Sequence, residues 1–133
     1  MARTKRDGIS PLGRWIRPVK RRAIYARDGY KCGYCQKDLR VVKREVDRQL
    51  DHIDGRAVRF TDGGQAVRNN HQSNLITACA ACNAAKADIA FTVFVKRFAG
   101  ADKRIARLVK LPLDLVAARN DLGLPPVRGY AQA

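Results

Sequence analysis

Acidic residues are scarce in this chain. Of its 133 residues, 12 are Asp or Glu and 27 are Lys or Arg, so the formal net charge at pH 7 is +15. An excess of this size indicates a polyanionic partner, with nucleic acid as the first candidate and an anionic membrane surface as the second. Because phosphate contacts release counterions, we expect binding to DNA that weakens steeply with salt. No recognition helix or finger array is evident, which predicts limited sequence preference or specificity supplied by a partner.

Long apolar runs are also lacking. Lys or Arg interrupts each hydrophobic stretch before it reaches the roughly 20 residues that a membrane-spanning helix needs. The first residues are polar and charged and no apolar run follows them, so we expect no signal peptide, no membrane partner and a cytoplasmic location. The length is typical of one compact domain with a modest core, and small domains often need an additional staple.

Cysteine is rare but regularly placed. The four cysteines form two C-x-x-C knuckles, one with Cys32 and Cys35 and the other with Cys79 and Cys82. A disulfide framework suits a secreted protein, and a thioredoxin-like redox pair calls for a βαβ pattern that neither knuckle has around it. Two knuckles in a reducing compartment instead predict one structural four-cysteine zinc site that joins distant parts of the chain.

Hydrophobic periodicity and turn residues predict an α+β chain. The expected elements, in order, are a helix over 18–27, a tight metal loop over 30–36, a short strand or irregular crossing over 37–43, a strand ending at 53, a brief return strand over 57–60, a polar loop over 61–73, a strand over 75–78, an Ala-rich helix over 83–87, and helices over 91–98, 101–110 and 113–121. The chain then divides into a flexible basic arm (1–16), a domain (17–100) and a C-terminal helical extension with a tail (101–133).

Four polar residues stand at the edges of these elements. Asp51 and His52 lie at the end of the first strand, Asn74 precedes the second, and Asn83 directly follows the last cysteine. In this order, the motifs C-x-x-C, Asp-His, Asn-Leu and C-x-x-C-Asn resemble the HNH endonuclease family, in the variant in which Asp-His begins the motif and Asn ends it. The matched region covers about residues 23–88. Each motif alone is weak, whereas their joint occurrence in this order is specific.

The resemblance implies a ββα-metal, treble-clef-like core in which two strands and a helix surround a divalent cation, with the zinc site as a staple and further helices at its flanks. His52 would be the general base that activates water, while Asp51 and Asn83 would bind Mg²⁺ or Mn²⁺. Asn74 would hold His52 in its working orientation. The implied activity is endonucleolytic hydrolysis of DNA to a 3′-hydroxyl and a 5′-phosphate. One site per chain would nick DNA, and a double-strand break would need a dimer or two encounters.

Several basic residues flank the expected cleft. The candidate phosphate contacts are Arg56, Arg59, Arg68 and Lys86. With so many cations in the chain each assignment is weak, and an exposed lysine without this role is the commoner case for Lys86. His71 is expected to be solvated or to stabilise its loop, and Tyr34 is expected to pack beside the first knuckle.

The sequence leaves two questions open. Successive residues of a regular strand point to opposite faces, so Asp51 and His52 reach one phosphate only if the strand ends or distorts there, as the following Asp54-Gly55 turn signal suggests. A non-catalytic zinc-dependent nucleic-acid-binding module, or an accessory subunit of a DNA-processing machine, explains the charge and the cysteines equally well. By analogy with small free-standing HNH proteins of bacteriophages, a protein partner in a DNA-packaging complex is a further expectation.

Overall fold

The computed structural model describes residues 16–55, 57–60 and 66–125, and for residues 57–60 and 66–68 it describes the backbone alone. Within these ranges, short helices surround two small antiparallel sheets, so the predicted α+β class is confirmed. The elements in order are α1 (Pro18–Arg27), η2 (Glu45–Asp47), β1 (Arg48–His52), β2 (Ala57–Phe60), β3 (Ala66–Arg68), η3 (Gln72–Asn74), β4 (Leu75–Cys79), α2 (Ala80–Lys86), α3 (Phe91–Phe94), η4 (Val95–Arg97), α4 (Ala101–Leu108) and α5 (Leu115–Asp121).

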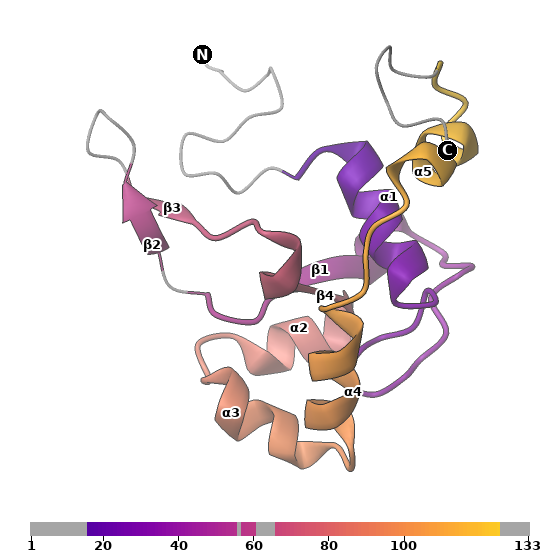
Figure 1. Ribbon diagram of the computed structural model, residues 1–133. Coiled ribbons are helices and arrows are strands. Elements are labelled where there is room, and N and C mark those ends of the chain that lie inside the picture. The colour runs from indigo at the N-terminus through magenta and orange to yellow at the C-terminus, as the bar shows by residue number, and fades with distance from the viewer. Residues whose placement is uncertain (1–15, 56, 61–65, 126–133) are drawn as a thin grey trace.

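A two-stranded sheet of β1 and β4 forms the centre of the fold (Figure 1). The strands are antiparallel, with Asp51 opposite Ile76 and His52 opposite Leu75. All five residues of β4 are buried, because α1 packs against this strand while α2 packs against both strands. A strand covered in this way must be almost wholly apolar, and its Leu-Ile-Thr-Ala-Cys sequence meets that requirement.

The end of α1 is tied to β4 by buried polar groups. The backbone amide and the hydroxyl of Thr77 both donate to Oδ2 of Asp28, each at 2.8 Å. Arg27 pairs with the same carboxylate at 2.7 Å and donates to the carbonyl oxygens of Gln72 and Leu75. Because these buried groups hydrogen-bond to one another, they fix the position of the end of α1 relative to β4.

The first knuckle lies directly against β4. The amide of Gly33 donates to the carbonyl oxygen of Thr77 at 2.8 Å. A Cβ atom at Gly33 would lie 2.5 Å from Cγ1 of Ile76, closer than any ordinary contact. Glycine is therefore required at this position by the close approach of the knuckle to the strand.

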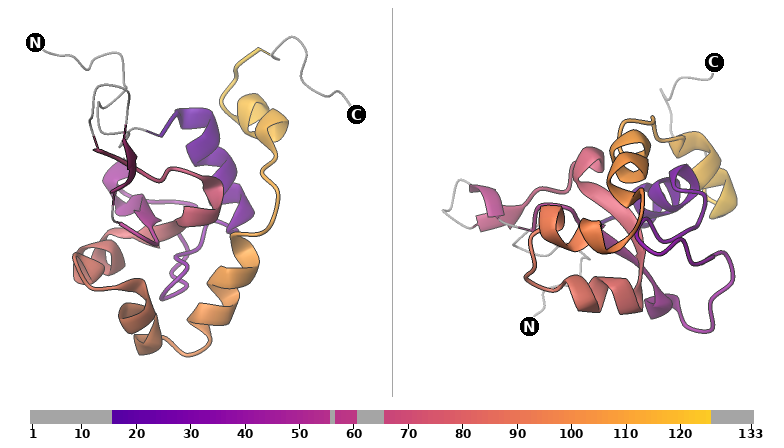
Figure 2. Two further views of the ribbon diagram at one scale, coloured as in Figure 1. Left: turned by 60° about the vertical axis from the view of Figure 1, so that its left-hand side comes forward. Right: turned by 90° about the horizontal axis from the view of Figure 1, so that it is seen from below.

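The core continues beyond the predicted domain boundary at residue 100. Ala101 and Ile105 of α4 are buried in the same apolar cluster as the cysteine knuckles and Phe94. Arg104 donates to the carbonyl oxygens of Gly33 and Tyr34 at 2.8 and 2.9 Å. Helix α5 packs against α1, on the side of the molecule away from α3 (Figures 1 and 2).

The structure corrects two of the expected elements. The range 61–73 was expected to be a loop, but residues 66–68 form β3, which pairs antiparallel with β2, and 72–74 form the 3-10 turn η3. The Asp62-Gly63-Gly64 sequence, a composition typical of hairpin connections, was the signal for this ribbon. Helix α2 begins at Ala80 and not at 83, because the sulfur of Cys79 accepts from the amide of Cys82 and so caps the helix.

The predicted helices at 18–27, 101–110 and 113–121 are present with small differences at their ends, and 37–43 takes the irregular form. The predicted helix at 91–98 is divided into the short α3 and the 3-10 helix η4. The ribbon of β2 and β3 projects from the rest of the described chain (Figures 1 and 2). In the part of the chain that the structure describes, no helix is long and apolar enough to cross a membrane.

Candidate functional site

The four cysteines converge, as their spacing predicts. Cys32 and Cys35 belong to the first knuckle, Cys79 ends β4 and Cys82 lies in the first turn of α2, yet their sulfur atoms all lie within 4.8 Å of one another. The thiols are free, and Sγ of Cys35 lies 3.8 Å from Sγ of Cys79. Tetrahedral zinc with Zn–S bonds of about 2.3 Å places its sulfurs about 3.8 Å apart. The cluster can therefore hold a metal such as zinc. Cys35 is the exposed member and the other three are buried.

The carboxylate of Asp51 lies in the interior beside this cluster. Asp51 is 6% exposed, and its Oδ2 accepts a hydrogen bond of 2.5 Å from the hydroxyl of Tyr34, a residue inside the first knuckle. Its Oδ1 lies 3.4 Å from the ammonium of Lys86, which also donates to the backbone oxygen of His52 at 3.1 Å. Each carboxylate oxygen thus has a donor, one neutral and one charged.

Burial dominates the protonation of this group. Desolvation raises the pKa of Asp51 above its ordinary value, against the opposing effects of the Tyr34 hydrogen bond and the Lys86 charge. Burial also raises the pKa of Tyr34 well above its ordinary value. The hydroxyl therefore stays protonated and donates a hydrogen bond to Asp51. The prediction that Lys86 is exposed is wrong, because its side chain is 6% exposed and forms an ion pair with Asp51.

Helix α2 faces the same side of β1 as Asp51. Gln49 and Asp51 are two residues apart on the strand and therefore share a face. Asn83 donates through its amide nitrogen to Oε1 of Gln49 at 2.6 Å, and Lys86, one helical turn later, contacts Asp51. The predicted ligands Asp51 and Asn83 thus lie along one helix–strand interface. In this arrangement the nitrogen of Asn83 is engaged, which makes its carbonyl oxygen the atom suited to a cation.

The imidazole of His52 has a different partner from the Asp51 carboxylate, the side-chain amide of Asn70. Its Nε2 lies 2.7 Å from Oδ1 of Asn70. An amide oxygen only accepts, so this contact requires a hydrogen on Nε2 and leaves the lone pair on Nδ1. Lys20 of α1 donates to the backbone oxygen of Asn70 at 2.5 Å, which fixes the segment that carries this amide.

Asn74 closes the loop beside His52. Its Oδ1 accepts from the amide of Asp54 at 2.8 Å, and its Nδ2 donates to the carbonyl oxygens of Asp54 and Asn69 at 3.1 and 2.8 Å. Asn74 is 6% exposed, and it makes backbone contacts on both sides of the loop. His71 is exposed and caps η3, since its Nδ1 accepts from the amide of Ser73.

A cavity of about 490 Å³ brings most of these residues together. Its lining consists of Gln49, Leu50, Asp51, His52, Gly55, Ala80, Asn83, Ala84, Lys86 and Ala87. Asp51 and His52 are the last two residues of β1, and both belong to the lining of this cavity, while their side chains have different hydrogen-bond partners. The strand stays regularly paired with β4 as far as His52. That Asp51 and His52 reach one phosphate therefore stays a prediction.

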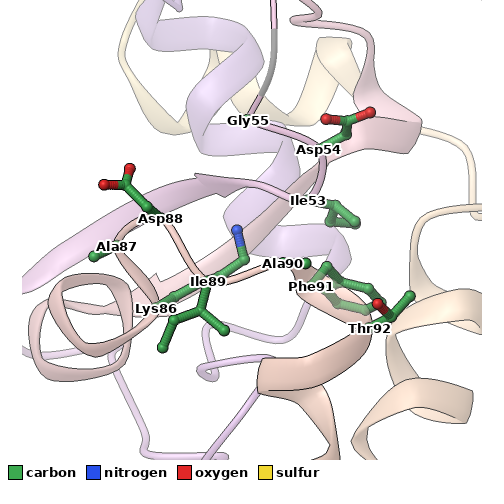
Figure 3. A pocket seen from close by; sticks show the side chains of 10 residues that line it. All are labelled: Ile53, Asp54, Gly55, Lys86, Ala87, Asp88, Ile89, Ala90, Phe91 and Thr92. Atoms are coloured by element: carbon green, nitrogen blue, oxygen red, sulfur yellow. The ribbon is translucent and has the colours of Figure 1, made fainter.

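A second cavity of about 620 Å³ adjoins the first through three shared residues, Gly55, Lys86 and Ala87. Figure 3 shows the amine of Lys86 turned away from the apolar side chains of Ile89 and Phe91, while the carboxylates of Asp54 and Asp88 point outward and apart. These carboxylates do not converge on a common point, so the second cavity has no assembled cation site.

Part of the basic excess is structural. Arg27 and Arg104 donate to backbone carbonyls in the core, and Arg48 donates to those of Leu39 and Arg40. Of the predicted phosphate contacts, Arg56 lies outside the described residues. Arg59 and Arg68 lie in β2 and β3, where only the backbone is described. The predictions for these three arginines therefore stay predictions.

Sequence reasoning missed three residues of this arrangement. The sequence predicts only a packing role for Tyr34. It assigns no role to Gln49, or to Asn70, which lies in a segment with several other polar residues. A signal existed for Gln49, because it shares a strand face with Asp51. For Tyr34 and Asn70 the partners are distant in sequence, at Asp51 and His52, so no local pattern points to them.

Comparisons with protein-family models, with curated proteins and with solved structures gave no match to this chain.

Proposed function

We propose that this chain is a metal-dependent endonuclease of the HNH type, which hydrolyses DNA phosphodiester bonds. The observation that carries the proposal is that Asp51, His52 and Asn83 line one cavity at the end of β1. These residues are the ones that the sequence motifs single out, and they come from segments that are up to 32 positions apart. A chance resemblance in sequence would give no reason for them to share a cavity.

The order and packing of the elements agree with a ββα-metal core. The strands β1 and β4 are antiparallel neighbours, and α2 follows β4 directly and packs across both. The four-cysteine cluster joins the first knuckle to the point where β4 meets α2. A structural zinc there would fix the helix that carries Asn83 relative to the strand that carries Asp51.

Asp51 and Asn83 fit a hard divalent cation by the chemistry of their donors. Both offer oxygen atoms, which Mg²⁺ and Mn²⁺ prefer, and neither adds the thiolate or imidazole typical of zinc. The ammonium of Lys86 at 3.4 Å from Oδ1 of Asp51 indicates that positive charge is stabilised at this position. When bound, the cation would neutralise charge on the scissile phosphate and on the departing 3′ oxygen.

His52 supplies the base in this proposal. Nδ1 takes a proton from water as the water oxygen forms its bond to phosphorus and the bond from phosphorus to the 3′ oxygen breaks. Asn70 keeps the hydrogen on Nε2, and Asn74 holds the backbone of the loop on which the orientation of His52 depends. The leaving 3′ oxygen takes a proton from solvent, which gives a 3′-hydroxyl and a 5′-phosphate.

DNA is the substrate that the charge favours. The net charge of +15 attracts a polyphosphate without reading bases, so cleavage with limited sequence preference is expected. The β2–β3 ribbon, which projects from the rest of the described chain (Figure 2), carries Arg59 and Arg68 in its sequence and is a candidate arm for the phosphate backbone. A phosphate contact by Lys86 would require its release from Asp51.

The direct test is conversion of supercoiled plasmid to nicked or linear DNA by the full chain at low salt. Cleavage with Mg²⁺ or Mn²⁺, none with EDTA, and product ends that a ligase can rejoin are the expected results, since rejoining needs a 3′-hydroxyl and a 5′-phosphate. Binding of DNA without cleavage under every cation would contradict the proposal and favour a zinc-dependent nucleic-acid-binding module.

A further inference from the structure

Tyr34 connects the four-cysteine cluster to Asp51, a residue of the proposed cation site. Its hydroxyl donates to Oδ2 of Asp51 at 2.5 Å, and its backbone lies between Cys32 and Cys35 of the four-cysteine cluster. We propose that Tyr34 is a positioning residue that presents the Asp51 carboxylate to the catalytic cation. This inference rests on the proposed function, because it concerns the same cation site.

The ring of Tyr34 is fixed independently of its hydroxyl. It packs against three phenylalanines of the α3–η4 segment, with centroid distances of 5.0 Å to Phe94, 5.9 Å to Phe98 and 6.3 Å to Phe91. Arg104 donates to its backbone oxygen. Tyr34 is 1% exposed, so neither the ring nor the hydroxyl has freedom to reorient.

The hydrogen bond divides the roles of the two oxygens of Asp51. Tyr34 occupies Oδ2 with a neutral donor, whereas Oδ1 faces the charged ammonium of Lys86. A cation that approaches Asp51 competes with Lys86 for Oδ1 and leaves the Tyr34 hydrogen bond intact. The hydroxyl thereby holds the carboxylate in one rotamer, and Oδ1 remains the atom that binds the metal.

The experiment is a Mn²⁺ titration of the zinc-loaded full chain, followed by electron paramagnetic resonance, for wild type, Tyr34→Phe and Asp51→Asn. Tyr30→Phe is the matched control, because it removes a hydroxyl that contacts Arg22 at the other end of the knuckle. We expect Tyr34→Phe to weaken Mn²⁺ binding by about 10–100-fold, the usual loss for a group that orients a metal ligand. Tyr30→Phe should bind as wild type does.

Cleavage adds a readout that a purely structural tyrosine would not change. In Tyr34→Phe the Mn²⁺ concentration for half-maximal cleavage should rise by about the same factor as the binding constant, and excess Mn²⁺ should recover most of the maximal rate. Loss of rate at all Mn²⁺ concentrations with unchanged affinity would overturn the inference.

Three outcomes separate this inference from the proposed function. If Asp51→Asn abolishes Mn²⁺ binding but Tyr34→Phe binds as wild type does, the inference alone fails. If wild type has no Mn²⁺ site that Asp51→Asn removes, the proposed cation site fails and the inference with it. Weakened binding in Tyr34→Phe, with a normal Tyr30→Phe, supports both.

A measurement on the wild-type chain covers the case in which Tyr34→Phe does not fold. In protein labelled with ¹³C at the tyrosine ζ carbon, Mg²⁺ should shift the Tyr34 signal, because its hydroxyl bonds the carboxylate that gains the cation. The signals of the other three tyrosines, Tyr25, Tyr30 and Tyr130, identified by their Phe variants, should stay in place. A Tyr34 signal that does not move while Mg²⁺ binds would overturn the inference.

Discussion

The ammonium of Lys86 lies 3.4 Å from Oδ1 of Asp51, and both side chains are less than a tenth exposed. Lys86 comes one helical turn after Asn83, so the same face of α2 carries a proposed cation ligand and a resident cation. In the absence of a divalent ion, this lysine neutralises a carboxylate that would otherwise be buried without a partner. Binding of a metal to Asp51 must therefore compete with it.

Lys86→Met should destabilise the cation-free protein and increase the stabilising effect of Mg²⁺. Removing one partner of a buried ion pair typically costs about 3–5 kcal/mol. Because Mg²⁺ then meets no competing ammonium, it should raise the melting temperature of the variant by more than that of wild type. Thermal unfolding with and without Mg²⁺ measures both effects, with exposed Lys103→Met as control. An equal response of wild type and Lys86→Met to Mg²⁺ would contradict the competition.

Asn74→Ala should lower stability and slow cleavage more than it affects DNA binding. The change removes three hydrogen bonds, one from the amide of Asp54 and two to the carbonyls of Asp54 and Asn69, at a cost of about 1–3 kcal/mol. Because this loop precedes the strand paired with His52, the cleavage rate should fall by about 10–100-fold. Urea unfolding, single-turnover cleavage and DNA affinity test this, with exposed Asn120→Ala as the control. A rate unchanged in folded Asn74→Ala would remove its positioning role.

The pH dependence of stability should differ between wild type and Asp51→Asn. Burial raises the pKa of Asp51 in the folded chain above its ordinary value of 3.8. The stability that this carboxyl contributes is therefore fully present below pH 3.8 and is lost as pH rises through the raised pKa. The free energy of unfolding of Asp51→Asn, minus that of wild type, should increase from about pH 4 toward neutral pH. Urea unfolding of both zinc-loaded proteins without divalent cation measures it, and a constant or falling difference would contradict the buried carboxyl.

Removal of zinc should unfold the region around the knuckles. Structural zinc contributes on the order of 10 kcal/mol in zinc-finger peptides, comparable with the whole stability of a small domain. Cys35 is exposed, so a strong chelator can reach the cluster. Circular dichroism should show a lower melting temperature after chelation and recovery when zinc is restored. A melt that is the same with and without chelator would contradict a structural role for the metal.

The zinc cluster and the central elements were predictable because they depend on local patterns. Two C-x-x-C knuckles define a four-cysteine site wherever they lie in the chain, and the apolar run from Leu75 to Ala78 reads as a buried strand. The helix over 18–27 carries its own signals, with Pro18 at its start and Gly29 just beyond its end.

Other features depend on contacts that no local pattern encodes. The burial of Lys86 follows from its approach to Asp51, 35 positions earlier. Helix α4 joins the core through Ala101 and Ile105, which are buried in the cluster around the knuckles. The three-residue strand β3 is too short for its periodicity to be recognised, and it exists through pairing with β2. In the same way, Tyr34 and Asn70 become part of the site only when the fold brings them to Asp51 and His52.

The most direct test of the account compares plasmid cleavage by wild type, His52→Ala and His71→Ala. The chain has two histidines, so His71→Ala is a matched control that removes an exposed imidazole outside the cavity. Zinc content, far-UV circular dichroism and DNA affinity establish that each variant is folded and binds. The account predicts that His52→Ala binds DNA but cleaves about 10²–10⁴-fold more slowly, while His71→Ala cleaves like wild type. Equal cleavage by wild type and His52→Ala would contradict the assignment of His52 as the base.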